Sequence, residues 1–223
     1  MTSTSSPTSS PTSSPTSSPT SSPTGTSNPA SGQTIALQGI HHVAYRCIDA
    51  LATVTFYQRH LQMDFLLAIA ENEVPSTKAP DPYMHVFLDA GRGNVLAFFE
   101  VPTAATMGFD ANTPAWVQHI AFQIDDLDQL QAAKERLVDA GIEVIGPVEH
   151  TIFQSIYFFD PNGHRLELAV NTAKPGMLAE LKRVAPAMLA EWSRTKQAPN
   201  HAAWLHGHGT FEPGTATDES SEA

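Results

Sequence analysis

The stretch Ile40-His-His-Val-Ala-Tyr-Arg-Cys-Ile-Asp49 returns in altered form as Val117-Gln-His-Ile-Ala-Phe-Gln-Ile-Asp-Asp126. Both copies place a histidine, a β-branched residue, an alanine and an aromatic residue in the same order, and both then run to an aspartate. Apolar residues alternate along each copy, which predicts a β-strand. A repeat of this kind indicates that one chain contains two equivalent structural units.

An amphipathic helix is expected after each of these strands. The first covers residues 51–61, with Phe56 and Tyr57 facing inward. The second covers residues 127–140 and ends at Gly141, since glycine readily adopts the left-handed conformation that follows a helix. The residues expected on its buried face are Leu130, Ala133 and Leu137.

Three short strands are expected to follow each helix. They lie near 65–70, 85–88 and 94–101 in the first unit, and near 143–148, 155–159 and 165–170 in the second. Gly91–Gly93 and Asp160-Pro-Asn-Gly163 provide turns within the two units. The predicted fold class is therefore α+β, with two βαβββ modules at about 37–102 and 115–170 that wrap around a shared cup.

The ends of the chain differ in composition from this central domain, which we place at 35–172. Residues 5–24 are repeats of Ser-Ser-Pro-Thr, and such a polar segment buries too little apolar area to fold, so residues 1–34 are predicted to be a disordered tail. A C-terminal helical extension is expected at 173–211, with a helix at 179–192 packed outside the cup. The polar, acidic residues 212–223 are predicted to form a second disordered tail.

The overall charge restricts the partners. The formal net charge is −11 at pH 7 and no basic stripe interrupts it, which disfavours nucleic acid and anionic membrane surfaces. No apolar run approaches the roughly 20 residues of a membrane span, and no secretory signal is recognisable. The single cysteine, Cys47, lies in an apolar run and is interpreted as a buried structural thiol in a reducing compartment. We expect a cytoplasmic protein.

Four side chains at equivalent places in the two modules are candidate metal ligands. His42 lies in the first strand and Glu100 in the last strand of the first module, and His119 and Glu167 are assigned the same positions in the second. A carboxylate within an apolar strand needs a partner, and a metal would be the simplest one. Two imidazoles and one carboxylate with open positions suit Fe(II) and oxygen. His41 is expected to point to the opposite face of its strand.

The repeated unit with these His and Glu positions resembles the vicinal oxygen chelate superfamily, which includes glyoxalase I, extradiol dioxygenases and fosfomycin- and bleomycin-resistance proteins. The resemblance covers about 37–169 and implies a metal in the cup between the two modules.

Within the superfamily, the segment from Val148-Glu-His150 through Ile156-Tyr157 and Asp160-Pro-Asn-Gly163 to Glu167 is similar to the signature of extradiol ring-cleavage dioxygenases. By this resemblance Glu167 is a ligand of Fe(II), and His150 and Tyr157 bind the substrate oxygens. The implied function is that of a metal-dependent oxidoreductase acting on a catechol-like aromatic.

The sequence departs from the dioxygenase pattern at two places, so two other functions remain as alternatives. The dioxygenases carry a further catalytic histidine before the last strand of the first module, where this chain reads Gly91-Arg-Gly-Asn94, although His85 is nearby. Glu100 would complete the four-ligand set of a glyoxalase I-like isomerase or lyase using Ni(II), Co(II) or Zn(II). A protein of this fold that binds a small molecule without turnover is the third alternative.

The partner expected in each case is a small molecule. Aromatic residues that could line an apolar cup are Phe98, Phe122, Phe153 and Phe159. One chain already contains both modules of a cup, so the sequence leaves the oligomeric state open, a homodimer included.

Overall fold

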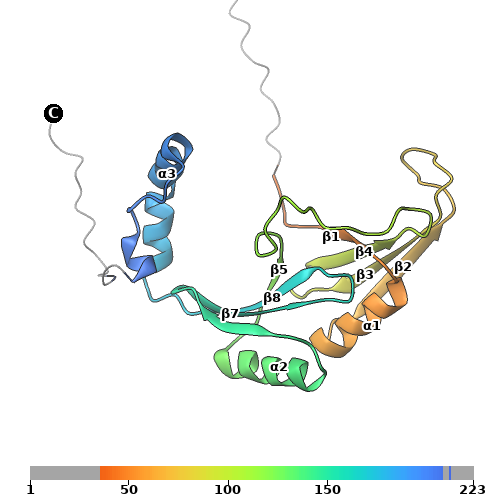
Figure 1. Ribbon diagram of the computed structural model, residues 1–223, viewed down its shortest axis with the longest axis horizontal. Helices are drawn as coiled ribbons and strands as arrows, with labels where there is room; N and C mark the ends of the chain where they lie inside the picture. Colours follow the sequence, from red (N-terminus) through yellow and green to blue (C-terminus); the bar gives the residue numbers. More distant parts are fainter. Residues whose placement is uncertain (1–35, 208–210, 212–223) are drawn as a thin grey trace, which may run out of the picture. The chain divides into compact units, whose positions relative to one another are not determined.

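The computed structural model describes residues 36–207 and 211. The chain divides into Met1–Gln38 and Gly39–Ala223, and every helix and strand of the described residues belongs to the second unit (Figure 1). The tails predicted at 1–34 and 212–223 lie outside the described residues.

The first module is a four-stranded sheet with one helix. Its elements are β1 (Val43–Cys47), α1 (Ala50–Leu61), β2 (Phe65–Glu71), β3 (Tyr83–Asp89) and β4 (Val95–Glu100). The strand order is β1-β4-β3-β2, with β1 parallel to β4 and the other pairs antiparallel.

The second module repeats this topology. It consists of β5 (Ile120–Gln123), α2 (Leu127–Asp139), β6 (Ile145–Glu149), β7 (Phe153–Phe159) and β8 (Arg165–Asn171), in the order β5-β8-β7-β6. β5 is parallel to β8, as β1 is to β4. The prediction of two βαβββ modules is confirmed.

The aspartates that end the repeated sequence begin the two helices. The Asp49 carboxylate accepts a hydrogen bond from Ala52 N at 2.7 Å, and the Asp126 carboxylate accepts one from Gln129 N at 2.8 Å. Each satisfies an amide of the first helical turn that has no partner within the helix. Gly141, with φ of 79°, follows α2 as predicted. The repeated aspartate therefore marks the strand-to-helix junction in both modules.

Each helix packs on one face of its own sheet and builds a core shared by the two modules. Tyr57 of α1 and Leu130 and Leu137 of α2 are buried with Phe158 of β7. Phe98, a candidate for lining the cup, is also fully buried in this core, and Phe122 packs against it. The prediction that these two aromatic rings line a ligand site is wrong, because strand alternation turns them toward the helices.

A buried polar network ties the second module's hairpin turn to α1. Ile48 N donates to Asn162 Oδ1 at 2.8 Å, and Asn162 Nδ2 donates to Thr53 Oγ1 at 3.0 Å. The Tyr57 hydroxyl donates to Asp160 Oδ2 at 3.0 Å. Burial and the neighbouring Asp160 hold the pKa of Tyr57 well above its usual value, so this phenol stays a donor. The turn Asp160–Gly163 thus fixes one module against the other.

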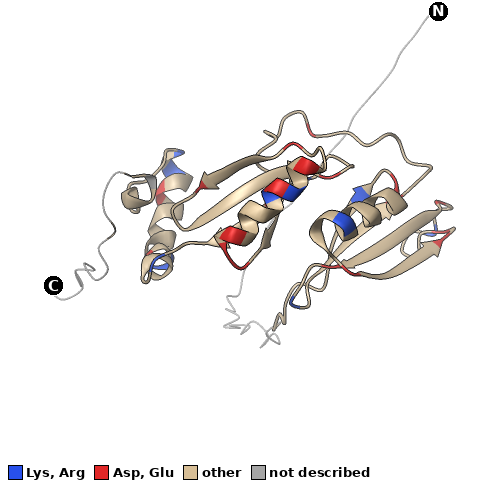
Figure 2. Ribbon diagram, turned by 90° about the horizontal axis from the view of Figure 1, so that it is seen from below, with Lys and Arg blue, Asp and Glu red and all other residues tan. Residues whose placement is uncertain are grey.

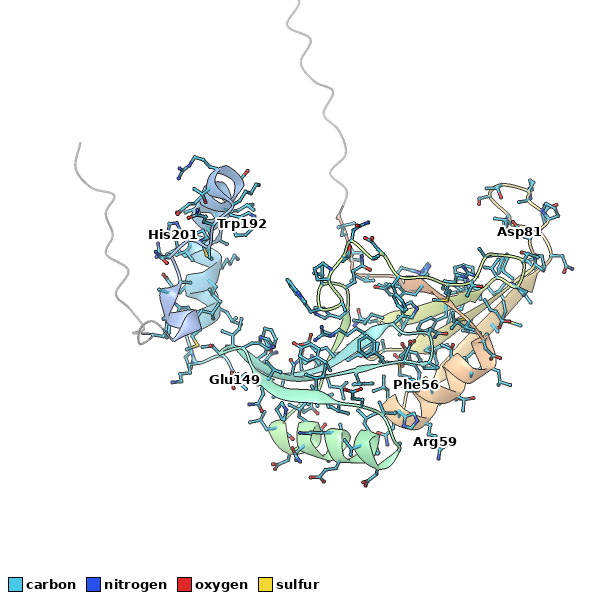
Figure 3. All side chains as sticks on the ribbon, in the orientation of Figure 1. Phe56, Arg59, Asp81, Glu149, Trp192 and His201 are labelled. Atoms are coloured by element: carbon cyan, nitrogen blue, oxygen red, sulfur yellow. The ribbon has the colours of Figure 1, made fainter. Side chains whose placement is uncertain are left out.

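The C-terminal extension contains α3 (Met177–Thr195) and the 3₁₀ helix η1 (Ala203–His206). His201 and Trp192 both belong to it (Figure 3), and His201 Nε2 lies 2.9 Å from Glu191 Oε2. Thr151 Oγ1 donates to the Leu205 carbonyl at 2.8 Å, which attaches η1 to the turn between β6 and β7. No helix within the described part of the chain is long and apolar enough to cross a membrane.

The exposed face of α2 carries both signs of charge. Figure 2 marks acidic and basic residues interspersed along the ribbon. The exposed residues of α2 include Glu135, Arg136 and Asp139. Its opposite face is apolar and buried through Leu130, Ala133 and Leu137, as the sequence predicted. This division between faces is what orients α2 on its sheet.

Candidate metal and substrate site

Glu167 of β8 is a carboxylate held almost entirely out of water. It is 3% exposed, and its neighbours along the strand, Leu166 and Leu168, are buried. The Ser155 hydroxyl donates to its Oε1, and His119 Nε2 lies 3.1 Å from its Oε2. A buried charge needs such partners, because losing its hydration is unfavourable. The imidazole and the carboxylate together form a pair of donor atoms suited to a metal.

Tyr157 places a phenol beside this pair. It lies opposite Glu167 in the register between β7 and β8, and its hydroxyl lies 2.9 Å from His150 Nε2. Burial, and next the charge of Glu167, raise the pKa of Tyr157, so the phenol keeps its proton at neutral pH. Phe153 stacks on the His150 ring with centroids 4.5 Å apart, which holds the imidazole in place. The structure thus brings His119, His150, Tyr157 and Glu167 together.

Two further polar residues of this group are Ser155 and Arg165, which the sequence reasoning missed. The Arg165 guanidinium carbon lies 4.3 Å from the centroid of the Tyr157 ring, within the range of a cation–π contact. A signal was available, because Ser155 and Arg165 each lie two residues from Tyr157 or Glu167 along a strand and therefore share their face.

His42, the ligand predicted in the first module, has a different set of neighbours. Its Nδ1 lies 2.8 Å from Nδ1 of His41, and its ring is 6.2 Å from that of His85 and 5.9 Å from that of Phe87. His41 and His42 both precede β1, so the strand alternation expected to separate them does not apply. Among the described residues no three His, Cys, Asp or Glu side chains are grouped so as to hold a metal ion.

His85 lies in the first module close to His42. It is buried on β3, its ring stacks on Phe99 with centroids 3.5 Å apart, and burial lowers its pKa. Its Nε2 has no hydrogen-bond partner among the described residues. His85 is therefore a neutral imidazole held between aromatic rings beside His42.

Glu100 does not occupy the position equivalent to Glu167. Val43 pairs with Leu96 and Ile120 pairs with Leu166, so the first-module counterpart of Glu167 is Ala97. Glu100 follows three residues later, and its Oε2 accepts a hydrogen bond from Ala50 N at 2.7 Å, at the start of α1. The expected equivalence is wrong because counting residues between His and Glu does not fix the register of the strands. The geometry gives Glu100 a helix-capping contact.

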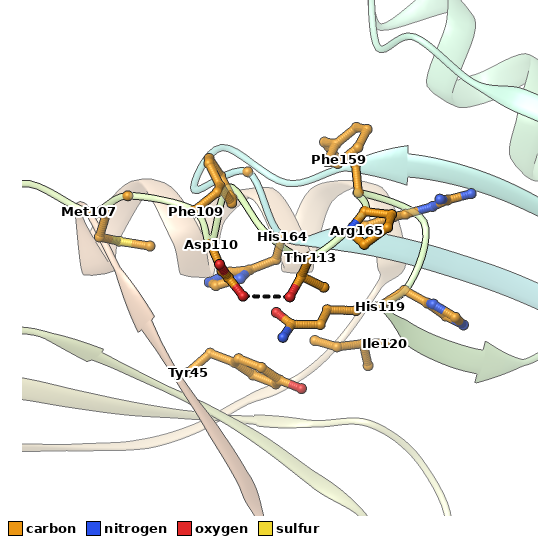
Figure 4. Close-up of a pocket in the computed structure, with 15 residues that line it drawn as sticks. Tyr45, Met107, Phe109, Asp110, Thr113, His119, Ile120, Phe159, His164 and Arg165 are labelled. Atoms are coloured by element: carbon orange, nitrogen blue, oxygen red, sulfur yellow. Dashed lines mark hydrogen bonds between the residues drawn. The ribbon is translucent and has the colours of Figure 1, made fainter. Parts of the chain in front are cut away.

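A cavity of about 470 Å³ adjoins His119 (Figure 4). Its walls come from β1, from the connector between the modules (residues 101–119) and from the turn between β7 and β8. The lining residues include Tyr45, Met107, Phe109, Asp110, Thr113, Pro114, His119, Phe159, His164 and Arg165. Of the four aromatics expected to line a site, Phe159 lines this cavity and Phe153 contacts His150.

The fold and this site define a family. The model of the Glyoxalase/Bleomycin resistance protein/Dioxygenase superfamily matches residues 39–168, and the chain belongs to that superfamily. Its members include metalloenzymes of several activities.

Two curated relatives have names that state different activities. The metallothiol transferase FosB of Shouchella clausii is 34% identical over 123 residues, which are 50% of this chain and 83% of that protein. The biphenyl-2,3-diol 1,2-dioxygenase 3 of Rhodococcus globerulus is 39% identical over 71 residues, which are 30% of this chain and 37% of that protein.

Among solved structures, the fosfomycin resistance protein FosX of Listeria monocytogenes, complexed with Mn(II) and sulfate, is 20% identical with a TM-score of 0.44. The match covers 61% of this chain and 95% of FosX.

Proposed function

We propose that this chain is a metal-dependent dioxygenase that opens the ring of a catechol-like aromatic substrate. The observation that supports this most is the hydrogen-bonded pair of His150 and Tyr157, with 2.9 Å between Nε2 and the hydroxyl, beside the His119–Glu167 pair. A phenol and an imidazole next to two metal donors are suited to a substrate that has two adjacent oxygens and must lose protons.

His119 and Glu167 fit a divalent metal, since they offer an imidazole nitrogen and a carboxylate oxygen that lie 3.1 Å apart in a buried setting. His42 is the third ligand in this proposal, and Fe(II) is the metal that such a set favours. Glu100 is left out because its carboxylate contacts the first turn of α1. When bound, the metal would supply Lewis-acid activation and a common binding point for catechol and dioxygen.

The protein's own groups would orient the substrate and move its protons. The protonated Tyr157 hydroxyl can donate to a substrate oxygen, and His150, hydrogen-bonded to that hydroxyl, can accept a proton from the substrate and return it to the product. Arg165, above the Tyr157 ring, places positive charge beside the oxygens as they lose protons. Ser155 fixes Glu167 through its hydrogen bond to Oε1.

The proposal includes a homodimer, in which His42 of one copy completes the site of the other. Within one chain, the contacts of His42 are with His41, His85 and Phe87 of its own module. The first module also presents an apolar surface to solvent. All seven residues of the edge strand β2 are exposed, and Phe65, Leu66, Leu67 and Ile69 are each more than 40% accessible. An apolar edge strand of this kind is a ready surface for a second copy.

The experiment is anaerobic loading of the full-length protein with Fe(II), followed by exposure to air with a panel of catechols. Consumption of oxygen and formation of a yellow ring-opened product are expected, and both should be absent in Tyr157→Phe with His150→Ala. Absence of both signals with the unmodified protein across the panel would exclude the proposal.

Transfer of a thiol is a second candidate, favoured by the match to a metallothiol transferase over most of that relative's length. Arg165 beside the His119–Glu167 pair would suit an anionic substrate. Glutathione or cysteine with an epoxide phosphonate distinguishes the two: consumption of thiol without oxygen uptake supports transfer. The glyoxalase-like alternative is less favoured, because it requires Glu100 at the metal and the Glu100 carboxylate accepts a hydrogen bond from Ala50 N.

A further inference from the structure

We propose that Thr151 is a positioning residue, and that the C-terminal 3₁₀ helix η1 acts through it to hold His150 against Tyr157. This inference rests on the proposed dioxygenase function, because it concerns how the proposed acid–base residue of that same site is held in place.

The turn between β6 and β7 has an unfavourable backbone conformation at Thr151. This residue has a φ of 71°, in the left-handed region that β-branched side chains rarely adopt. Ile152 N donates a hydrogen bond to the His150 carbonyl at 2.8 Å, so the chain reverses its direction around Thr151. A strained turn of this kind persists only where surrounding contacts hold it.

The contacts that hold the turn come from three parts of the chain. Thr151 N donates to Glu149 Oε1 at 2.6 Å, and the Ile152 carbonyl accepts a hydrogen bond from Thr172 N at 2.9 Å. The Thr151 hydroxyl donates to the Leu205 carbonyl at 2.8 Å, 54 residues further along the chain. Among these hydrogen bonds, the one made by the hydroxyl links the turn to the C-terminal extension.

The same turn determines where the His150 ring lies. His150 N donates to the Phe153 carbonyl at 2.9 Å, and the two rings stack with centroids 4.5 Å apart. The Nε2 atom of His150 then lies 2.9 Å from the Tyr157 hydroxyl. Rotation of Thr151 into the ordinary right-handed region would break the Ile152–His150 hydrogen bond and redirect the chain on either side. The imidazole would then leave the phenol.

The segment that carries the accepting carbonyl is itself fixed. Ala202, directly before η1, is only 4% exposed, and its carbonyl accepts a hydrogen bond from Leu205 N at 2.9 Å. Gly207 N donates to the Trp204 carbonyl at the end of the helix. The C-terminal extension therefore presents an ordered acceptor to Thr151, and detaching this extension should affect His150 through the turn.

The kinetic test compares two substitutions at Thr151 in the full-length, Fe(II)-loaded protein with catechol. Thr151→Val keeps the β-branched shape and removes the hydroxyl, and Thr151→Ser keeps the hydroxyl. Loss of one hydrogen bond should lower kcat roughly three- to tenfold in Thr151→Val, with KM and metal content unchanged. Thr151→Ser should retain most of the activity. The control is Thr55→Val, since the exposed Thr55 hydroxyl also donates to a backbone carbonyl, that of Leu51 at 2.7 Å.

A second readout does not depend on turnover. In protein with histidine labelled isotopically at Cε1, the NMR signal that disappears in His150→Ala identifies His150. This signal should move toward its position in the unfolded protein in Thr151→Val and should stay in place in Thr151→Ser.

Ala202→Glu tests whether η1 acts through Thr151. A charge at this buried position should detach η1 and move the His150 signal in the same direction as Thr151→Val does. The double variant should be no more affected than either single one, because both changes break the same contact. Additive effects of the two changes would contradict a route through Thr151.

An unmoved His150 signal in Thr151→Val, or a Thr151→Ser protein as impaired as Thr151→Val, would overturn the inference. The proposed function fails separately. A His150 signal that depends on the Thr151 hydroxyl, in a protein that consumes no oxygen with any catechol, would support the positioning contact and contradict the dioxygenase. Oxygen consumption by a protein whose His150 signal is the same in Thr151→Val would do the reverse.

Discussion

Tyr157 lies between His150, the proposed acid–base residue, and the buried carboxylate Glu167. Its hydroxyl is within hydrogen-bond distance of His150, and its backbone lies opposite Glu167 in the sheet. The surrounding strand is rigidly placed, because Ile156 and Phe158 on either side are buried in the core. A change confined to the hydroxyl therefore tests its chemistry with little effect on packing.

Tyr157→Phe should lower kcat by roughly 10²–10⁴, the usual contribution of a positioned proton-transfer group, with the metal content unchanged. Steady-state kinetics and elemental analysis on the same preparation measure the two effects. Tyr83→Phe, on β3 of the other module, is the matched control and should retain full activity. A Tyr157→Phe protein with unaltered kcat would remove this residue from the mechanism.

Cys47 should be unreactive in the folded protein. It is buried, and burial raises its pKa from 9.0 to about 11. The folded state therefore favours the protonated thiol, and the stability that this contributes is present below pH 9 and is lost as the pH rises toward 11. At pH 8 the lower thiolate fraction alone slows alkylation about 100-fold relative to an ordinary thiol. Iodoacetamide labelling with and without urea measures this, and rapid labelling without urea would contradict it.

At the scale of residues, the grouping of polar side chains could be predicted from the sequence for the second module but not for the first, although the fold of both modules was predicted. His119, His150, Tyr157 and Glu167 lie together because the spacing between them is set by one β-hairpin and its parallel neighbour. His42 and Glu100 depend on how the first module's strands pair and on how the modules meet. The pairing of strands and the packing of the modules are long-range contacts, and the number of residues between two side chains does not predict them.

At the scale of elements, each copy of the repeated sequence contains a strand and the first residue of a helix. The positions of β1 and α1, and of β5 and α2, were therefore predicted to within a few residues. Strand alternation then separates helix-facing from open faces. The connector 101–119 has no such periodicity, since its conformation depends on turns and on the contact of Phe109 with Gly163. That is why the cavity wall was not foreseen.

Glu100→Gln tests the role of Glu100 at the start of α1. The carboxylate accepts a hydrogen bond from Ala50 N and places negative charge at the positive end of the helix dipole. Its neutralisation should lower the free energy of unfolding by about 0.5–2 kcal/mol, measured by urea denaturation, with metal content and kcat retained. Glu143→Gln, at an exposed carboxylate, is the control. Loss of metal in Glu100→Gln would instead support a four-ligand metal site of the isomerase type, with Glu100 as a ligand.

At the scale of the whole molecule, the proposed dimer with shared sites would account for the exposed β2 strand and for the separate surroundings of His42. If each site takes His42 from one copy and Glu167 from the other, His42→Ala and Glu167→Gln should each be inactive alone. Unfolding and refolding them together should restore roughly a quarter of the unmodified activity, because half of the dimers are mixed and each has one intact site. A mixture as inactive as its components would show that both ligands must come from the same chain.

The metal content of protein purified without chelator tests the proposed metal centre at His119 and Glu167. Close to one divalent metal per chain, iron foremost, is expected in the unmodified protein, and this metal should be lost in Glu167→Gln and retained in Glu143→Gln. Unmodified protein without stoichiometric metal, or Glu167→Gln with undiminished metal, would contradict a metal centre at His119 and Glu167.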